Sequence, residues 1–184
     1  MDNMNTIVLE PLKNDVDFDS REFDCGEPQI NKQIQNAYFR HILKQLDVYS
    51  IKIAGYVVGY VAISVKSISI NSAEGDIADY FDGSCIVGAV KVDFIGIDKK
   101  VQRNGIGTAV IELIVKKVRL DAKHLPIRIL MIDAISTKTS WYHERGFKHM
   151  DVGSGISAFT KAMYLDLMDE KQKAAIEEYV KNNL

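Results

Sequence analysis

Hydrophobic and polar positions form two kinds of pattern along this chain, and the first kind, short apolar runs, predicts β-strands. Short apolar runs rich in β-branched and aromatic residues recur from the N-terminus to the C-terminus, and such runs are typical of strands. Ala54-Gly55 separates two of these runs and predicts a hairpin turn. The predicted strands are Thr6–Leu12, Val48–Ile53, Tyr56–Ser64, Val87–Ile97, Ile127–Ile132 and Ala162–Leu167.

The second pattern is helical, with apolar side chains three or four positions apart. Glu27-Pro28 predicts a helix start, because proline suits a first turn, and apolar residues at helical spacing continue to Ile42. A second helix is predicted from Ile106, a third from about Thr137 to Arg145 with Gly146 as its C-cap, and a fourth over Asp169–Leu184. The apolar face of the second helix consists of Ile106, Ala109, Val110, Leu113, Ile114 and Val118.

The order of these elements predicts the fold class. Strand, helix and strand over Val87–Ile132 form a βαβ unit, whose two strands should be parallel. With the hairpin, the whole chain becomes an α/β (α+β) protein with a central mixed sheet and helices on both faces. Residues 66–86 are polar, contain glycine and give no clear pattern.

Composition narrows the class of protein. A chain of 184 residues with 47 % hydrophobic residues suits one globular domain. No apolar run reaches the roughly 18 residues of a membrane span, and the first ten residues lack a secretion-signal pattern. Cys25 and Cys85 form no CxxC pair, which favours a reducing, cytoplasmic location. His143-Glu144 resembles the start of a zincin motif, but Phe147 replaces the second histidine, so no metal site is predicted.

Charge is distributed unevenly within a net charge of −2. Residues 1–30 carry two basic and eight acidic side chains, whereas residues 91–128 carry nine basic and four acidic ones. A solvated helix face would explain the basic excess, and so would a segment that meets phosphate groups.

The segment Gln102–Gly107, of sequence QRNGIG, lies between a predicted buried strand and a predicted helix. Helix N-termini leave backbone N–H groups unpaired and carry partial positive charge. Glycine lets the backbone approach an anion closely, and a pyrophosphate fits such a turn. Lys99 and Lys100 add positive charge beside it. The glycines match neither the Rossmann nor the P-loop pattern, so a tight turn without a ligand explains them equally well.

Two motifs make the chain resemble the GNAT superfamily of N-acetyltransferases. Gln102-x-x-Gly105-x-Gly107 resembles the superfamily's Q/R-x-x-G-x-G/A signature, which also follows a strand and begins a helix. Downstream, the segment 140–147, SWYHERGF, resembles the superfamily's "fYeklGF" helix and turn. The resemblance implies a GNAT-like fold with a splayed sheet over residues 1–168, followed by a helical extension over residues 169–184.

One branch of the superfamily fits best. Residues 23–26, FDCG, resemble the "FxCG" start of the acetyltransferase toxins of bacterial toxin–antitoxin modules. Residues 59–62, GYVA, resemble their "GYYAL" strand, and residues 95–98, IGID, resemble their "LAVD" segment. This resemblance implies acetyl-CoA as co-substrate, the amino group of aminoacyl-tRNA as acceptor, a small DNA-binding antitoxin as partner, and a homodimer. Cys25 is expected to be a small buried residue at a helix start rather than a nucleophile.

The superfamily resemblance also implies roles for individual residues. The pantetheine arm would bond to the backbone of Ile95, Gly96 and Ile97, with the Ile97 N–H as oxyanion donor, although an ordinary paired strand is equally compatible with these side chains. Tyr142 would be the general acid, whereas without the motif it would be assigned to packing. The loop residues implied to bind the cofactor are Gln102, Arg103, Asn104, Gly105, Ile106, Gly107 and Thr108.

The residue that deprotonates the amine does not follow from the resemblance. Asp93 shares a strand face with Ile95, and a carboxylate in an apolar strand needs either a partner or a function. A salt bridge to a nearby cation would explain Asp93 equally well, and Asp133 is a weaker candidate. An α-amino group needs no dedicated base, because its reference pKa is already about 8.

Three functions are compatible with the sequence. The chain is expected to acetylate a primary amine, either on aminoacyl-tRNA as a toxin or on a small molecule or protein N-terminus. The slight acidity of the chain favours the second acceptor class, since tRNA binding requires positive charge. A non-catalytic module that binds acetyl-CoA and assembles through its C-terminal helix is the third possibility.

Overall fold

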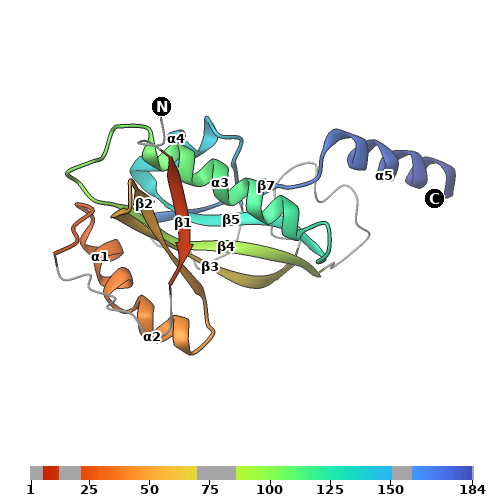
Figure 1. Cartoon of the computed structure of the whole chain (residues 1–184). Coiled ribbons are helices and arrows are strands. Elements are labelled where there is room, and N and C mark those ends of the chain that lie inside the picture. The colour runs from red at the N-terminus through yellow and green to blue at the C-terminus, as the bar shows by residue number, and fades with distance from the viewer. Residues whose placement is uncertain (1–5, 13–21, 70–85, 151–158, 184) are drawn as a thin grey trace. The chain divides into compact units, whose positions relative to one another are not determined.

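The computed structural model describes residues 6–12, 22–69, 86–150 and 159–183. Its seven strands form one mixed sheet in the order β1-β2-β3-β4-β5-β7-β6, with helices packed on it (Figure 1). The strands are β1 (Ile7–Pro11), β2 (Asp47–Ile53), β3 (Tyr56–Ser69), β4 (Ile86–Ile97), β5 (Ile127–Ile135), β6 (Lys148–His149) and β7 (Thr160–Asp166). The helices are α1 (Pro28–Gln35), α2 (Ala37–Ile42), α3 (Ile106–Asp121), the 3₁₀ turn η3 (Ser136–Lys138), α4 (Thr139–His143) and α5 (Glu170–Asn183).

The chain separates into two compact units. The first unit combines Met1–Val65 with Lys91–Lys117, and the second combines Lys66–Val90 with Val118–Leu184. None of the helices that the structure describes has the length and apolarity of a membrane span. The domain boundary predicted between residues 168 and 169 stays a prediction.

The hairpin predicted at Ala54-Gly55 is confirmed in the first unit. Ile53 and Tyr56 are paired across a two-residue turn, in which Ala54 has φ 50° and Gly55 has φ 83°. Two consecutive positive φ angles match the right-handed twist of the flanking strands. On its other edge β2 pairs antiparallel with β1, so the hairpin extends into a three-stranded meander.

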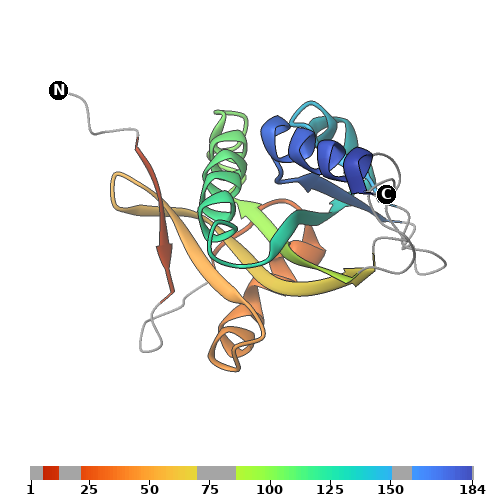
Figure 2. The same cartoon turned by 90° about the vertical axis from the view of Figure 1, so that its right-hand side faces the viewer.

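Helices cover both faces of the strands in the first unit. In the views of Figures 1 and 2, α1 and α2 lie on one face of the strands and α3 lies on the other. The core on the α1–α2 side consists of buried residues from both helices, the following loop and three strands, namely Ile34, Ala37, Leu46, Val48, Tyr60, Ala62 and Phe94. The prediction of helices on both faces is therefore confirmed for this unit.

The single helix predicted after Pro28 is wrong in one respect, because the structure divides it into α1 and α2. Asn36 separates them with φ −91° and ψ −2°. Asparagine is a poor helix-interior residue because its side chain competes for backbone hydrogen bonds. The apolar spacing continues across the break, since Ile34 and Ala37 are both fully buried, and the sequence pattern therefore does not show it.

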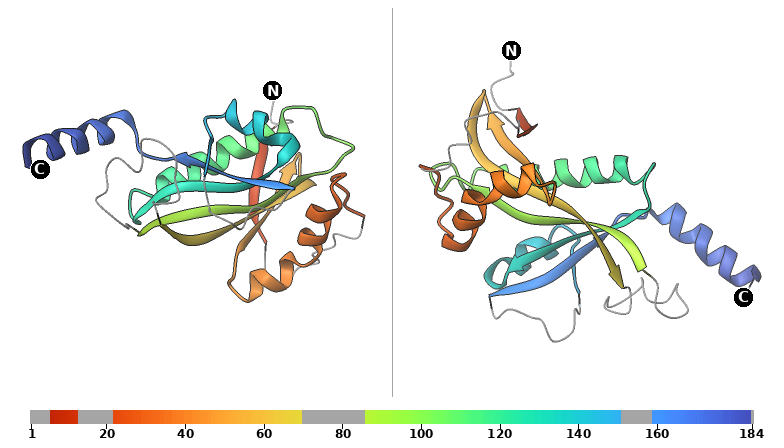
Figure 3. Two further views of the ribbon diagram at one scale, coloured as in Figure 1. Left: turned by 180° about the vertical axis from the view of Figure 1, so that it is seen from behind. Right: turned by 90° about the horizontal axis from the view of Figure 1, so that it is seen from below.

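The second unit contains an antiparallel trio of strands. β7 pairs antiparallel with both β5 and β6, and β5 and β7 run side by side in Figure 3. Its core consists of Ala89, Ile129, Met131, Met150 and Tyr164. The sequence did not predict β6, because two residues are too few to show an alternation. α5 extends away from β5 and β7, with most of its side chains exposed.

The helix predicted before Gly146 is present as η3 and α4. Gly146 has φ 83°, and its N–H donates to the His143 carbonyl at 2.9 Å. This left-handed residue ends the helix as predicted. The Phe147 N–H then donates to the Tyr142 carbonyl at 3.2 Å, which fixes the turn that follows α4.

Gly59 of β3 lies against Gly96 of β4, and we expect a side chain at Gly59 to destabilise the protein. A Cβ at Gly59 would clash with the Gly96 carbonyl oxygen, a backbone atom that cannot move aside cheaply. Gly59→Ala should therefore lower the free energy of unfolding by about 1–3 kcal/mol. Thermal unfolding should show a decrease of about 2–4 °C in Tm per kcal/mol, and an unchanged Tm would mean that the two strands accommodate the methyl group.

Candidate functional site

The loop between β4 and α3 begins with a series of hydrogen bonds around Asp98. Its backbone N–H donates to the Val58 carbonyl at 2.8 Å, and its own carbonyl accepts the Val101 N–H at 3.0 Å. Its side-chain Oδ1 accepts the Lys100 N–H at 2.8 Å. Asp98 thus connects the end of β4 to the start of the loop and fixes the direction in which the loop leaves the strand.

Gly105 adopts a conformation that favours glycine, at the point where α3 begins. Its φ is 76°, and Arg103 two residues earlier has φ 65°. The Gly105 carbonyl accepts the Ala109 N–H at 3.1 Å, which makes Gly105 the N-cap of α3. No atom of the described part of the chain lies within 4 Å of the position that a Cβ would take at Gly105. The φ angle therefore favours glycine here, and the described residues leave the space beside it open to a ligand.

The predicted loop residues lie at the start of α3 as expected. Gln102, Arg103 and Asn104 are exposed, and the Asn104 side-chain amide donates to the Val101 carbonyl at 3.2 Å. Ile106 is buried, and Gly107 and Thr108 follow it in the first turn. A helix N-terminus supplies backbone N–H groups and partial positive charge, which together suit an anion.

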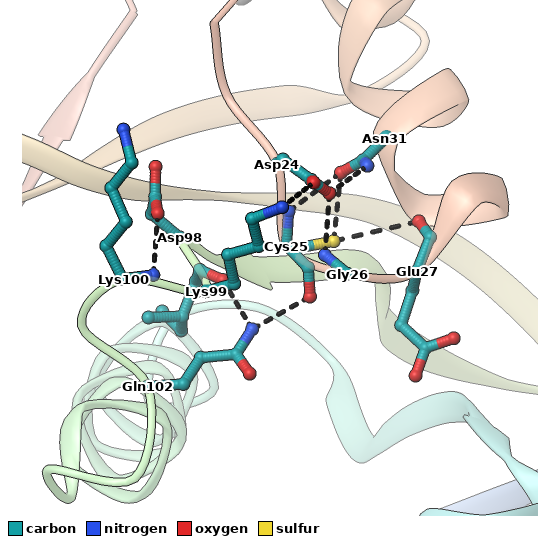
Figure 4. Close-up of polar contacts among 10 residues, drawn as sticks. Asp24, Cys25, Gly26, Glu27, Asn31, Asp98, Lys99, Lys100 and Gln102 are labelled. Atoms are coloured by element: carbon teal, nitrogen blue, oxygen red, sulfur yellow. Dashed lines mark hydrogen bonds and ion pairs between the residues drawn. The ribbon is translucent and has the colours of Figure 1, made fainter.

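The Gln102 side chain contacts the protein's own backbone. Its Nε2 donates to the Cys25 carbonyl and to the Ile97 carbonyl, each at 2.8 Å (Figure 4). The sequence resemblance assigned Gln102 to cofactor binding. In the structure, these two hydrogen bonds of its amide nitrogen join the end of β4 to the turn before α1.

Asp24, in the turn before α1, is the centre of a second group of contacts close to Gln102 (Figure 4). Its Oδ1 accepts the Gly26 N–H and the Asn31 side-chain amide, both at 2.8 Å. Its Oδ2 accepts the Lys99 ammonium at 2.7 Å. The Lys99 hydrogen bond holds the pKa of the Asp24 carboxyl well below its usual range, and the same bond raises the pKa of Lys99.

Cys25 is buried, as predicted, with 6 % of its surface exposed. Its Sγ donates to Asn31 Oδ1 at 3.0 Å, and its N–H donates to the same oxygen at 3.0 Å. Burial raises the pKa of the Cys25 thiol. A buried thiol that stays protonated is a poor nucleophile, so the structure confirms that Cys25 packs at a helix start.

Gly96, in the middle of the predicted pantetheine segment, is buried against α1. A Cβ there would lie 2.7 Å from Ile34 Cδ1 and 3.3 Å from Ile30 Cγ2. The lack of a side chain at Gly96 therefore makes room for the isoleucines of α1. Ile95 and Ile97, on either side of it, are half-buried.

Asp93 pairs with Arg40 of α2. The Arg40 Nη2 and Asp93 Oδ1 lie 3.6 Å apart, and 11 % of the Asp93 side chain is exposed. The salt bridge that the sequence left open as the alternative to catalysis is thus present. The other carboxylate oxygen, Oδ2, is buried and has no hydrogen-bond partner among the residues that the structure describes, so Asp93 can still accept one hydrogen bond from a donor.

Tyr142 lies in the second unit and is held by aromatic contacts. It is 6 % exposed and meets the rings of Trp141 and Phe147 edge to face, with centroids 4.7 and 5.6 Å away. The Arg145 guanidinium stacks on Trp141 at 3.8 Å. Burial raises the pKa of Tyr142 to about 12, against a smaller opposing effect of Arg145. The phenol is therefore protonated at neutral pH and available as a donor.

The sequence did not single out Asp24, Asn31 or Arg40. Asp24 and its partner Lys99 are 75 residues apart, and no periodicity connects them. The FDCG motif contains Asp24, but the resemblance that it carries implies no role for the aspartate. Among the residues that the structure describes, no group of three or more His, Cys, Asp or Glu side chains could hold a metal ion.

Comparison with known proteins finds similarity at the level of structure. No protein-family model matches the sequence, and no curated protein matches it significantly. A mutant of KacT matches with TM-score 0.74 and 18 % identity, over 94 % of this chain and 98 % of KacT. AtaT complexed with acetyl-methionyl-tRNAfMet matches with TM-score 0.73 and 19 % identity, over 95 % and 99 %. A mutant AtaT toxin bound to acetyl-CoA and the C-terminus of the antitoxin AtaR matches with TM-score 0.70 and 20 % identity, over 95 % and 98 %.

The chain therefore has the fold of the GNAT acetyltransferases over nearly its whole length. Within that class, the structures that it resembles include the toxins AtaT and KacT. The fold class predicted from the sequence and the resemblance to the toxin branch are both confirmed.

Proposed function

We propose that this protein is an N-acetyltransferase that moves the acetyl group of acetyl-CoA to a primary amine. The observation that carries the proposal is the loop from Asp98 to Gly105, whose positive φ angles and open flank present the start of α3 to an anion. It is supported by the likeness, over 95 % of the chain, to an AtaT structure that contains acetyl-CoA.

In this proposal, the loop and the strand before it hold the co-substrate. Backbone N–H groups from Gly105 to Thr108 bind the diphosphate, because a helix N-terminus attracts anions. The backbone of Ile95–Ile97 binds the pantetheine arm, and the Ile97 N–H stabilises the oxyanion that forms when the amine attacks the thioester.

Tyr142 donates a hydrogen bond to the departing sulfur. Its pKa of about 12 lies well above that of a simple thiol, about 8.5. Full proton transfer to a free thiolate would therefore be unfavourable, and Tyr142 acts mainly by stabilising negative charge on sulfur while the carbon–sulfur bond breaks. A buried donor is more effective in this role than one exposed to water.

Asp93 is the proposed acceptor for a proton or hydrogen bond from the amine. Its Oδ1 is held by Arg40, and Oδ2 remains able to accept. An α-amino group has a reference pKa of about 8 and needs no strong base. We therefore assign Asp93 the role of orienting the amine through Oδ2.

The acceptor that we propose is the amino group of aminoacyl-tRNA, with the protein acting as a toxin. AtaT, which this chain resembles at TM-score 0.73, has been solved with acetyl-methionyl-tRNAfMet, and another AtaT structure contains part of an antitoxin. A small antitoxin as partner, a homodimer of this chain and a cytoplasmic location belong to the same proposal. The net charge of −2 favours the second acceptor class, a small amine or protein N-terminus.

The test is transfer of labelled acetyl from acetyl-CoA to a panel of acceptors. The purified protein is incubated with charged tRNA, uncharged tRNA, a peptide with a free N-terminus, and spermidine. We expect label on charged tRNA only, together with inhibition of cell-free translation that depends on acetyl-CoA. Label on spermidine or the peptide alone would replace the toxin proposal by the second acceptor class. Calorimetric binding of acetyl-CoA without transfer to any acceptor would favour the non-catalytic alternative.

A further inference from the structure

The contacts of Gln102 limit what that side chain can do for a bound cofactor. A glutamine amide has two N–H donors, and both are directed at protein carbonyls, those of Cys25 and Ile97 at 2.8 Å each. The remaining polar atom, Oε1, only accepts hydrogen bonds and would be repelled by a phosphate. Gln102 therefore acts on the protein itself, although it is the first residue of the loop motif.

The carbonyl of Cys25 can accept this bond because the turn around it is fixed. Asp24 Oδ1 accepts two hydrogen bonds, one from the Gly26 N–H and one from the Asn31 side-chain amide. Asn31 in turn accepts the Cys25 N–H through its Oδ1 at 3.0 Å. Gly26 has φ 80°, so the turn also needs a residue that tolerates this angle. The N–H groups of Cys25 and Gly26 are thereby held by the side chains of Asn31 and Asp24.

A second connection joins the same turn to the loop. The Lys99 N–H donates to the Asp24 carbonyl at 2.9 Å, and the Lys99 ammonium donates to Asp24 Oδ2 at 2.7 Å. Figure 4 shows the two connections together, with Lys99 and Gln102 reaching the turn from the same segment. The Lys99 charge is neutralised by Asp24, so it adds little to the attraction of a phosphate.

From this arrangement we infer that Asp24 and Gln102 are positioning residues. They hold the turn Phe23–Gly26 against the segment Ile97–Gln102. In this way they set the conformation of the loop from Asp98 to Gly105, which is proposed to bind the diphosphate, without touching acetyl-CoA. The inference rests on the proposed function, because it assigns the purpose of a loop that is proposed to bind acetyl-CoA. It gives the FDCG segment the role of holding the loop in its conformation, and Asp24 rather than Cys25 is the side chain that does so.

The inference is tested first on the protein without cofactor, by amide hydrogen exchange. The variants are Asp24→Asn, which removes the charge, and Gln102→Leu, which removes both donors at similar size. Each should increase exchange at the N–H groups of residues 98–105 several-fold and leave β5 and β7 unchanged. Glu170→Gln is the matched control, because it removes one carboxylate charge from an exposed ion pair with Lys173 of α5. Unchanged exchange in the loop of both variants would overturn the inference.

The second measurement is a double-mutant cycle on acetyl-CoA affinity, read by calorimetry. Two residues that support one loop conformation are coupled, whereas two independent contacts add. Each single variant should weaken binding about ten-fold, and the double variant should weaken it by little more than either one. Weakening of about 100-fold in the double variant would mean that Gln102 contacts the cofactor directly and would overturn the inference.

The two proposals fail in different ways. If the unaltered protein binds no acetyl-CoA but the variants still loosen the loop, the proposed function is wrong while the structural connection stands. If acetyl-CoA binds equally to all variants, the positioning inference is wrong while the proposed function stands. Gln102→Glu is a second test, because it keeps the shape and removes the donors. It should resemble Gln102→Leu in both measurements, and unaltered behaviour would contradict the inference.

Discussion

Replacing Tyr142 by phenylalanine is expected to lower kcat by about 10²–10³-fold, the range found when one preorganised hydrogen-bond donor to a developing negative charge is removed. The hydroxyl is the only group lost, and the ring keeps its contacts with Trp141 and Phe147. Because the phenol is buried and its pKa is raised to about 12, water cannot easily replace it as donor to the sulfur. The dissociation constant of acetyl-CoA should change less than three-fold, since the donated bond strengthens only as charge develops.

The measurement combines single-turnover acetylation with calorimetry of acetyl-CoA binding. Tyr56→Phe is the matched control, because Tyr56 is 77 % exposed in the β2–β3 hairpin and its hydroxyl should be irrelevant to transfer. A Tyr142→Phe enzyme with an unchanged single-turnover rate would exclude Tyr142 as the donor. The aromatic assembly around it would then be a purely structural part of the second unit.

Replacing Gly105 by valine is expected to raise the dissociation constant of acetyl-CoA at least ten-fold. Gly105 has φ 76°, an angle that a β-branched residue avoids strongly. The loop must therefore change conformation, and the first N–H groups of α3 change direction with it. The cofactor loses several hydrogen bonds to its diphosphate at once, and calorimetry reads the loss directly.

Two variants separate loop geometry from general strain. Gly55→Val places valine at φ 83° in the hairpin turn, where, as at Gly105, a Cβ would have no neighbour within 4 Å. It should lower Tm as much as Gly105→Val without changing affinity for acetyl-CoA. Gly105→Asn should keep most of the affinity, because asparagine tolerates left-handed φ. Equal loss of affinity in Gly55→Val and Gly105→Val would show that strain, not the loop, is responsible.

The sequence predicted the elements well wherever their physical basis is local. The apolar runs located β1 to β5 and β7 to within a few residues, apart from the C-terminal end of β3. Ala54-Gly55 marked the hairpin between β2 and β3, because two positive φ angles are needed there. It did not predict the break at Asn36, because apolar spacing continues across it. β6 was too short to leave any pattern.

The sequence by itself determined the class of fold and the place of the loop, because strand periodicity, helix periodicity and a glycine at positive φ are properties of neighbouring residues. Only the tertiary structure decided which side chains act together. It brought Asp24 to Lys99 across 75 positions and directed the amide of Gln102 to protein carbonyls. It also paired Asp93 with Arg40 and buried Tyr142. Hydrogen bonds and burial depend on distances that folding creates, and no local pattern in the chain records them.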